Sequence, residues 1–288
     1  MIANDNKVTV RPAHQPVEAW SGKDKGDENF PVASLLIAKE LRPHIYAYYN
    51  YARNADDISD SSTLSVEDKL TRLEAMETCL TGQQPSGSPS AEKLRESLAR
   101  SHVPATHARE LLIAFRQDVT KTRYENWAEL MEYCRYSAAP VGRYVLDLHG
   151  ESHDSWASSD ALCASLQVLN HLQDCAKDLK TLDRCYIPQD WLHAQGLTTG
   201  DVARPETSPA LRIVFDQMLA ATESLNQQAA ALPRRVKSRR LRMECAIICY
   251  LARRLTILLK QGDPLTTRVK LRKIDMLAAI LHSLRYAA

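Results

Sequence analysis

Hydrophobic residues along the chain recur mostly at intervals of three and four positions, with polar residues between them. This period is typical of amphipathic α-helices, whereas a half-buried strand alternates at every second residue. Glycine is scarce, at 9 of 288 residues, and alternating β-branched runs are few. The pattern predicts an all-α protein with helices at about 31–60, 66–82, 90–100, 105–120, 126–150, 158–181, 208–231, 235–262 and 270–286.

The breaks between these helices are short and polar. The stretches "TGQQPSGSPS" (81–90) and "LTTGDVARPETSP" (197–209) have the composition of loops. Residues 1–26 are polar and aperiodic, and we expect them to form a loose lead-in segment. No break is long enough to separate two domains and no repeat is visible, so we expect a single domain over 27–288.

Composition narrows the class of protein. A content of 44% hydrophobic and 25% charged residues is ordinary for a globular core, and a net charge of +2 gives no reason to expect nucleic acid as a partner. Seven cysteines without a CxxC pair argue against a disulfide framework or a thiolate zinc site. The first twenty residues lack an apolar signal core, and no 18 apolar residues run together. We therefore expect a soluble, cytoplasmic chain.

Two aspartate motifs carry the clearest chemical signal. The stretch "ARNADDISD" (52–60) places three carboxylates within five residues, and "NHLQDCAKD" (170–178) holds a second pair. Residues four apart share a helix face, so Asp56 lies beside Asp60 and Asp174 beside Asp178. Like charges this close are costly to ionise together, and a positive partner is therefore expected.

The identity of that partner has two interpretations. A DxxxD on a helix is usually a solvated stripe, and carboxylates next to cations also form structural ion-pair networks. Here both motifs are flanked by apolar residues, with Arg53 one turn before Asp56 and Lys177 beside Asp178. Clustered carboxylates with nearby cations suit Mg²⁺ shared with a substrate phosphate. The competing GxGxxG, P-loop, HExxH and paired ExxH motifs are absent from the sequence.

The residues around the motifs resemble a known family. The stretch "YNYARNADDISD" followed by "NHLQDCAKDLKTLDRCYIP" resembles the two signatures of squalene and phytoene synthases, the head-to-head prenyl transferases, and the likeness covers about residues 28–285. The stretches "ENFPVAS" (28–34) and "YCRYSAAPVGR" (133–143) look like the hopanoid-pathway branch, which makes hydroxysqualene from presqualene diphosphate. Where the family has Val-Ala-Gly, this chain has Ser137, Ala138 and Ala139, followed by Pro140. That departure favours the specialised branch.

The resemblance implies a fold, an activity and a set of site residues. The fold would be a single-domain class I isoprenoid synthase helical bundle around a central cavity, and the activity would be Mg²⁺-assisted ionisation of an isoprenoid diphosphate. The candidate metal ligands are Asp56, Asp57, Asp60, Asp174 and Asp178. The candidate substrate- and diphosphate-binding residues are Tyr49, Arg53, Asn170, Gln173, Lys177, Arg184, Tyr186, Tyr250 and Arg268, and the candidate catalytic residues are Tyr133, Tyr136 and Ser137.

The mechanism expected from this resemblance needs three features. Mg²⁺ and Arg53 would neutralise the leaving diphosphate, and aromatic faces would stabilise the carbocation. Ser137 is a candidate for holding the attacking water, although a helix serine more often bonds its own backbone. Candidate aromatic walls are Phe30, Tyr46, Tyr49, Tyr133 and Tyr136.

Rival functions and partners stay open from sequence. The chain could instead be a presqualene diphosphate, squalene or phytoene synthase, or a non-catalytic family member that acts as an assembly or binding protein. The basic segment "RRVKSRR" (234–240) could contact the inner leaflet of a membrane, with a solvated helix face as the alternative. Other enzymes of the pathway are further candidate partners.

Overall fold

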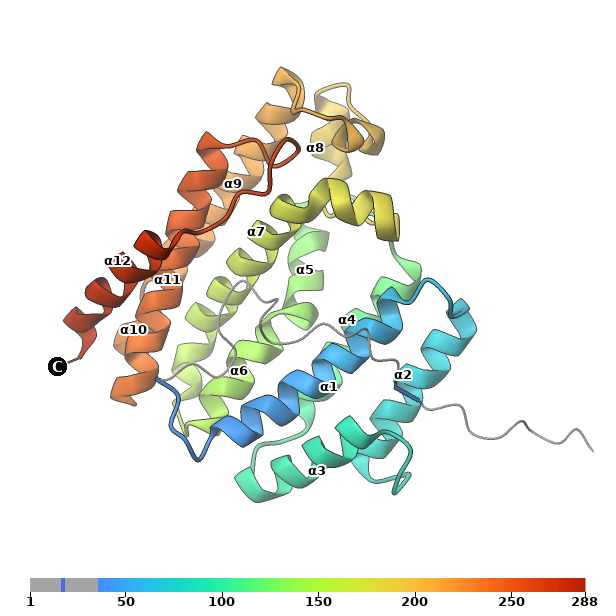
Figure 1. The fold of residues 1–288 in the computed structure, drawn as a ribbon, viewed down its shortest axis with the longest axis vertical. Coiled ribbons are helices and arrows are strands. Elements are labelled where there is room, and N and C mark those ends of the chain that lie inside the picture. The colour runs from blue at the N-terminus through green and yellow to red at the C-terminus, as the bar shows by residue number, and fades with distance from the viewer. Residues whose placement is uncertain (1–16, 19–35, 288) are drawn as a thin grey trace, which may run out of the picture.

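The regular structure of the chain is helical, as a computed structural model of residues 17–18 and 36–287 shows (Figure 1). Within these residues the only β-type pairing is an isolated bridge between Arg123 and Cys185. The prediction of an all-α fold is confirmed. The helices are α1 (Arg42–Asp60), α2 (Val66–Thr81), α3 (Pro89–Ser101), α4 (Thr106–Thr120), α5 (Trp127–Ser137), α6 (Ala139–Leu148), α7 (Trp156–Leu182), α8 (Gln189–Ala194), α9 (Pro209–Ala229), α10 (Leu232–Arg235), α11 (Arg239–Gln261) and α12 (Lys273–Ser283).

Most helices predicted from periodicity form within two or three residues of their expected ends, but the helix at 126–150 is wrong as a single element. The chain breaks at Ala138, which has φ −128° and ψ −46°, and divides into α5 and α6. Pro140 explains the break because it has no N–H to donate and its ring clashes with the carbonyl of Tyr136.

Other details of the helices and loops also differ from expectation. Residues 36–41 of the described chain are turns, so α1 starts at Arg42 instead of at position 31. The segment 234–240 is not one helix, because α10 ends at Arg235 and α11 begins at Arg239. Between these helices, the buried carboxylate of Glu151 accepts hydrogen bonds from the backbone N–H groups of Lys237 and Ser238, both at 2.7 Å. Helix α8 was not predicted, and the expected loop 197–209 contains the 3₁₀ turn Thr199–Ala203.

Two long helices define the middle of the molecule. Helix α1 packs against α2, α3 and α4, whereas α7 packs against α6, α9 and α11. Figure 1 shows α1 in blue and α7 in yellow-green running in the same direction, with their C-terminal ends toward the same side. The C-terminal halves of both helices carry the aspartate motifs, so the fold presents the two motifs at one end of the bundle.

Close packing and buried hydrogen bonds fix α7 in its position. The Ser165 hydroxyl donates to Asn226 on α9 at 2.7 Å, and the Asn226 amide donates to Thr256 on α11 at 2.9 Å. A methyl group at Gly142 on α6 would lie 2.3 Å from the Ser159 Oγ and 2.7 Å from the Cys163 Sγ. Glycine is therefore needed where α6 meets α7.

In the described part of the chain, no helix combines the length and the apolar character needed to span a lipid bilayer.

Candidate functional site

Helices α1 and α7 carry matching stripes that change from apolar to acidic along the chain. Positions three and four apart lie on one helix face, so each stripe is continuous along its helix. On α1 the stripe consists of Ile45, Tyr49, Ala52, Asp56 and Asp60, and on α7 it consists of Ser159, Cys163, Leu166, Asn170, Asp174 and Asp178.

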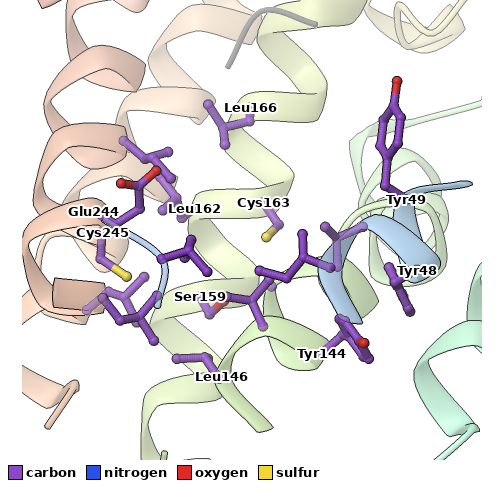
Figure 2. Close-up of a pocket in the computed structure, with 18 of the residues that line it drawn as sticks. Tyr48, Tyr49, Tyr144, Leu146, Ser159, Leu162, Cys163, Leu166, Glu244 and Cys245 are labelled. Atoms are coloured by element: carbon purple, nitrogen blue, oxygen red, sulfur yellow. The ribbon is translucent and has the colours of Figure 1, made fainter. Parts of the chain in front are cut away.

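The apolar halves of these stripes line a cavity of about 330 Å³. Helices α6 and α11 supply most of the remaining wall, and in Figure 2 Glu244 and Cys245 on α11 lie opposite Tyr48 and Tyr49 on α1. Most lining side chains are aliphatic or aromatic, and Glu244 is the one carboxylate among the described lining residues. Such a cavity suits a long hydrocarbon chain.

The acidic halves of the stripes meet beyond the cavity. Asp178 on α7 is close enough to Asp60 on α1 for their charges to interact. Burial, and then the negative charge of Asp174 and of Asp60, raises the pKa of Asp178 to about 7. Burial, and then the charge of Asp60, raises the pKa of Asp56 to about 7 as well, although 34% of its side chain is exposed. The structure therefore brings the two predicted motifs together.

Arg53 and Arg268 are paired with carboxylates of this cluster. Arg53 lies 2.9 Å from Asp56 and 2.8 Å from Asp57, whose side chain is nearly inaccessible to solvent. Arg268 reaches Asp174 at 2.8 Å. Lys177 is exposed beside the cluster, and its charge lowers the pKa of Asp178 against the stronger effects of burial and Asp174.

Arg184 lies at the centre of the cluster. Its buried guanidinium is 2.6 Å from the Asp60 carboxylate and also donates to the backbone oxygens of Asp118, at 2.9 Å, and of Ser59, at 3.4 Å. One side chain thus joins the C-terminal ends of α1 and α4 to the segment that follows α7.

The carboxylates provide the oxygen ligands that a divalent cation binds, but they are not arranged as a complete metal site. No three His, Cys, Asp or Glu side chains among the described residues stand close enough to hold an ion as they lie. Burial raises the pKa of Asp56 and Asp178 more than any neighbouring charge does, and nearby carboxylates raise it further against the opposite effect of Arg53 and Lys177. A bound cation would reduce this cost of ionisation, and carboxylate oxygens are the donors that Mg²⁺ prefers.

Asp118 is a site residue that sequence reasoning missed. It lies buried in the last turn of α4, accepts a hydrogen bond from the Tyr133 hydroxyl at 2.9 Å, and has a pKa raised to about 7, mainly by burial. Its signal was an acidic residue at a core position, seven residues after Leu111 and four after Ala114 along one helix face.

Aromatic rings surround Asp118. Tyr186 stacks on His171, with ring centroids 3.5 Å apart, and on Tyr124 at 5.5 Å, and its hydroxyl is 3.5 Å from Asp118. Burial lowers the pKa of His171 to about 3, and its Nε2 has no hydrogen-bond partner among residues 17–18 and 36–287. The structure thus places Tyr133 and Tyr186 in one buried network with Asp118.

Ser137, Tyr136 and Gln173 differ in their burial and in their hydrogen-bond partners. The Ser137 hydroxyl is buried at the break between α5 and α6, without a hydrogen-bond partner in the described part of the chain. Tyr136 lies half-buried under the guanidinium of Arg135, 5.3 Å from its ring. The side-chain amide of Gln173 donates a hydrogen bond to the backbone oxygen of Val269 at 2.6 Å.

Tyr250 and the first aromatic candidates lie elsewhere. The Tyr250 ring packs beside His282, in a groove between α11 and α12, and the structure does not bring it to the aspartates. Tyr46 is half-buried on α1. Phe30 and the segment 28–34 lie outside the described residues.

Comparisons with known proteins agree with this architecture. The family model described as squalene/phytoene synthase matches residues 23–275. The chain is 47% identical to a hydroxysqualene synthase of Zymomonas mobilis, over 89% of this chain and 87% of the relative, and 46% identical to one of Rhodopseudomonas palustris, over 91% and 89%. The crystal structure of squalene synthase HpnC from Alicyclobacillus acidocaldarius superposes with a TM-score of 0.72 at 30% identity, covering 81% of this chain and 88% of that one.

Proposed function

The chain belongs to the squalene/phytoene synthase family, and we propose that it is a hydroxysqualene synthase, which converts presqualene diphosphate and water to hydroxysqualene and diphosphate. The main support for this proposal is that the stripes on α1 and α7 line an apolar cavity with their first halves and form an acidic cluster with their second halves. The name shared by relatives at 46–47% identity selects the reaction within the family.

The acidic end would hold the diphosphate through Mg²⁺. Asp56, Asp60, Asp174 and Asp178 are the proposed ligands, and bound Mg²⁺ supplies positive charge that stabilises the departing diphosphate. The role of Asp57 is to hold Arg53, with which it is paired at 2.8 Å. Residues that would donate hydrogen bonds to diphosphate oxygens are Arg53, Lys177 and Arg268, since each carries its charge beside a proposed ligand.

The apolar end would hold the hydrocarbon chains and the carbocation left by cleavage of the carbon–oxygen bond. Aliphatic walls exclude water there, and the faces of Tyr48, Tyr49 and Tyr144 offer attraction to positive charge without a nucleophile that attacks it. The stacking of Tyr48 on Tyr144, with centroids 4.0 Å apart, keeps these two rings in place.

Hydroxysqualene forms when a water oxygen bonds to the rearranged cation and one proton leaves that oxygen. Tyr133 donates its own hydrogen to Asp118, which leaves the phenol oxygen available as an acceptor for the water. Asp118, with a pKa near 7, can take up the released proton through Tyr133. The unpartnered hydroxyl of Ser137 supports a second contact to the same water.

Product analysis by mass spectrometry tests this function. Presqualene diphosphate with Mg²⁺ should give hydroxysqualene whose oxygen comes from heavy-oxygen water, with or without NADPH. Farnesyl diphosphate alone should give almost no turnover. Squalene as the main product with NADPH, or turnover of farnesyl diphosphate alone, would assign the chain to another member of the family. The non-catalytic alternative predicts no turnover of any of these substrates, and it also predicts that Asp174→Ala changes nothing.

A further inference from the structure

The C-terminal helix α12 exposes an apolar face that the fold leaves uncovered in the described residues. Its buried side, Asp275, Ala279 and Ser283, faces the neighbouring helices. The opposite side presents large apolar side chains, with 63% of Ile274 and 59% of Leu281 accessible to solvent. We call this surface the α12 apolar face; it consists of Ile274, Leu277, Ile280 and Leu281, and of Leu284 in the 3₁₀ turn that follows.

The spacing of these residues makes the face continuous. Positions 274, 277, 281 and 284 repeat at three and four residues, so their side chains form one row along the helix. Single exposed apolar residues are normal on a protein surface, whereas this row of four, with Ile280 beside it, forms a contiguous apolar patch of the kind that marks interaction sites. Figure 1 shows α12 in dark red along the outer side of α11, with the C-terminus of the chain close by.

Positive charge surrounds the α12 apolar face. Lys273 and Arg285 are exposed at its two ends, and Arg272 is exposed one residue earlier. Asp275, the one acidic residue of α12, is buried and paired with Arg254 at 2.7 Å. The flank of this face is therefore cationic.

The groove between α11 and α12 extends this charge. It has a volume of about 510 Å³ and is lined by Arg253, Arg254 and Arg272. Pro233, which directly precedes the basic segment 234–240, lines the same groove as Tyr286. The basic segment therefore adjoins the end of α12.

The positive charge of the chain is concentrated in the segments that form or adjoin α12, whereas the rest of the chain is negative. Residues 234–242 and 272–287 together hold nine Lys and Arg and one Asp, a net charge of +8. The net charge of the chain is +2, so all other residues together carry −6. This asymmetry orients the α12 side toward a negatively charged partner.

We propose that the α12 apolar face, together with its cationic flank, docks the protein on an anionic lipid bilayer. An interfacial helix of this type buries its apolar side among the acyl chains while its Lys and Arg side chains contact lipid phosphates. Pairing with a second copy through the same face would bring two cationic flanks together and is disfavoured by charge.

Vesicle flotation of the full-length protein tests the proposal. We expect binding to vesicles that contain phosphatidylglycerol, weaker binding to pure phosphatidylcholine, and loss of binding at high salt. The variant L277Q/L281Q/L284Q should bind anionic vesicles about tenfold less tightly or worse, and K273E/R285E about thirtyfold less tightly. Because all five residues are exposed, their replacement should leave the melting temperature unchanged.

Matched controls carry equivalent changes elsewhere. I213Q replaces an apolar residue of α9 that is 52% exposed, and K93E/R100E reverses two exposed charges on α3. Both controls should bind vesicles like the unmodified protein. Absence of vesicle binding, or binding that the Gln and Glu variants leave intact, would overturn the proposal. If the Leu-to-Gln variant instead converts a dimer into a monomer in light scattering without affecting vesicle binding, the face is a self-association surface and the proposal is wrong.

Discussion

Arg184 and Asp60 form an ion pair at 2.6 Å although 124 positions separate them in the chain. The same guanidinium donates to the backbone oxygen of Asp118, so it bonds to residues of both α1 and α4. This contact holds the acidic end of α1 in place while the proposed ligands remain around it. Arg184 therefore acts on the site by positioning its carboxylates.

Replacing Arg184 by Ala should destabilise the protein by about 3–5 kcal/mol, because Asp60 and the Asp118 carbonyl would lose a buried partner. Chemical denaturation measures this change. The exposed pair of Arg123 with Asp183 provides a control, and Arg123→Ala should cost less than about 1 kcal/mol. Equal losses in the two variants would contradict the role of Arg184.

Stabilisation by Mg²⁺ should increase with pH. Asp56 and Asp178 have folded-state pKa values near 7, above the ordinary value of 3.8, so their contribution to stability is full at low pH and is lost as pH rises through 7. Mg²⁺ binds the ionised carboxylates and offsets this loss. Melting temperatures with and without MgCl₂, taken about one pH unit below and above 7, should show the larger shift at the higher pH.

The double variant Asp56→Asn and Asp178→Asn is the control for this pH dependence. It should lose most of the Mg²⁺-induced shift at both pH values, because its amides neither ionise nor attract the cation strongly. A shift of equal size in the variant and the unmodified protein would place the metal elsewhere.

Asp118→Asn and Tyr133→Phe should each lower kcat by about 10²-fold with little change in KM, since the proton acceptor acts after the substrate is bound. The two effects should not add in the double variant, because the residues share one hydrogen bond at 2.9 Å. Fully additive losses in rate would show that Tyr133 and Asp118 work independently.

Replacing Ser137 by Val should shift the product away from hydroxysqualene, because the hydroxyl proposed to hold the attacking water is removed. Val replaces the hydroxyl by a methyl group, adds a second methyl group on the β-carbon, and cannot form a hydrogen bond to the water. Chromatography of the products decides the matter, and an unchanged product ratio would remove Ser137 from the mechanism.

A methyl group added at position 142 should move α6 away from α7, because it would lie within 2.7 Å of two α7 side chains. We expect Gly142→Ala to destabilise the fold by about 1–3 kcal/mol and to raise KM, since this contact lines the cavity. Gly200 has only an ordinary contact at 3.5 Å, and Gly200→Ala should change the melting temperature and KM much less. Equal effects of the two changes would show that the α6–α7 contact does not shape the cavity.

The sequence predicted the features that depend on local spacing. The aspartates of α1 and α7 stand four apart, and helical geometry alone puts each pair on one face. That the two pairs adjoin each other depends on packing, which the spacing of the motifs allows but does not determine. The position of Arg184 was expected from the resemblance and not from any rule of spacing.

Features that depend on tertiary contacts were missed. Asp118 lies in an amphipathic helix that also carries the acidic residue Glu110, and only the fold shows that Tyr133 and Arg184 converge on Asp118. Pro140 indicates a helix break near Ala138. The apolar period continues on both sides of it, however, and led to the prediction of a single helix. Periodicity over 270–286 indicated apolar side chains without telling which of them the neighbouring helices would cover.

The stripe on α7 also sets a length. Cys163 borders the cavity and Asp174 belongs to the acidic cluster, and eleven residues of straight helix separate them by about 16 Å. The hydrogen bond between Ser165 and Asn226 holds this part of α7 against α9, so helix geometry and packing together fix the interval. Under the proposed function, changes to the side chains around Cys163 would alter which hydrocarbon fits, while the distance to the acidic cluster stays the same.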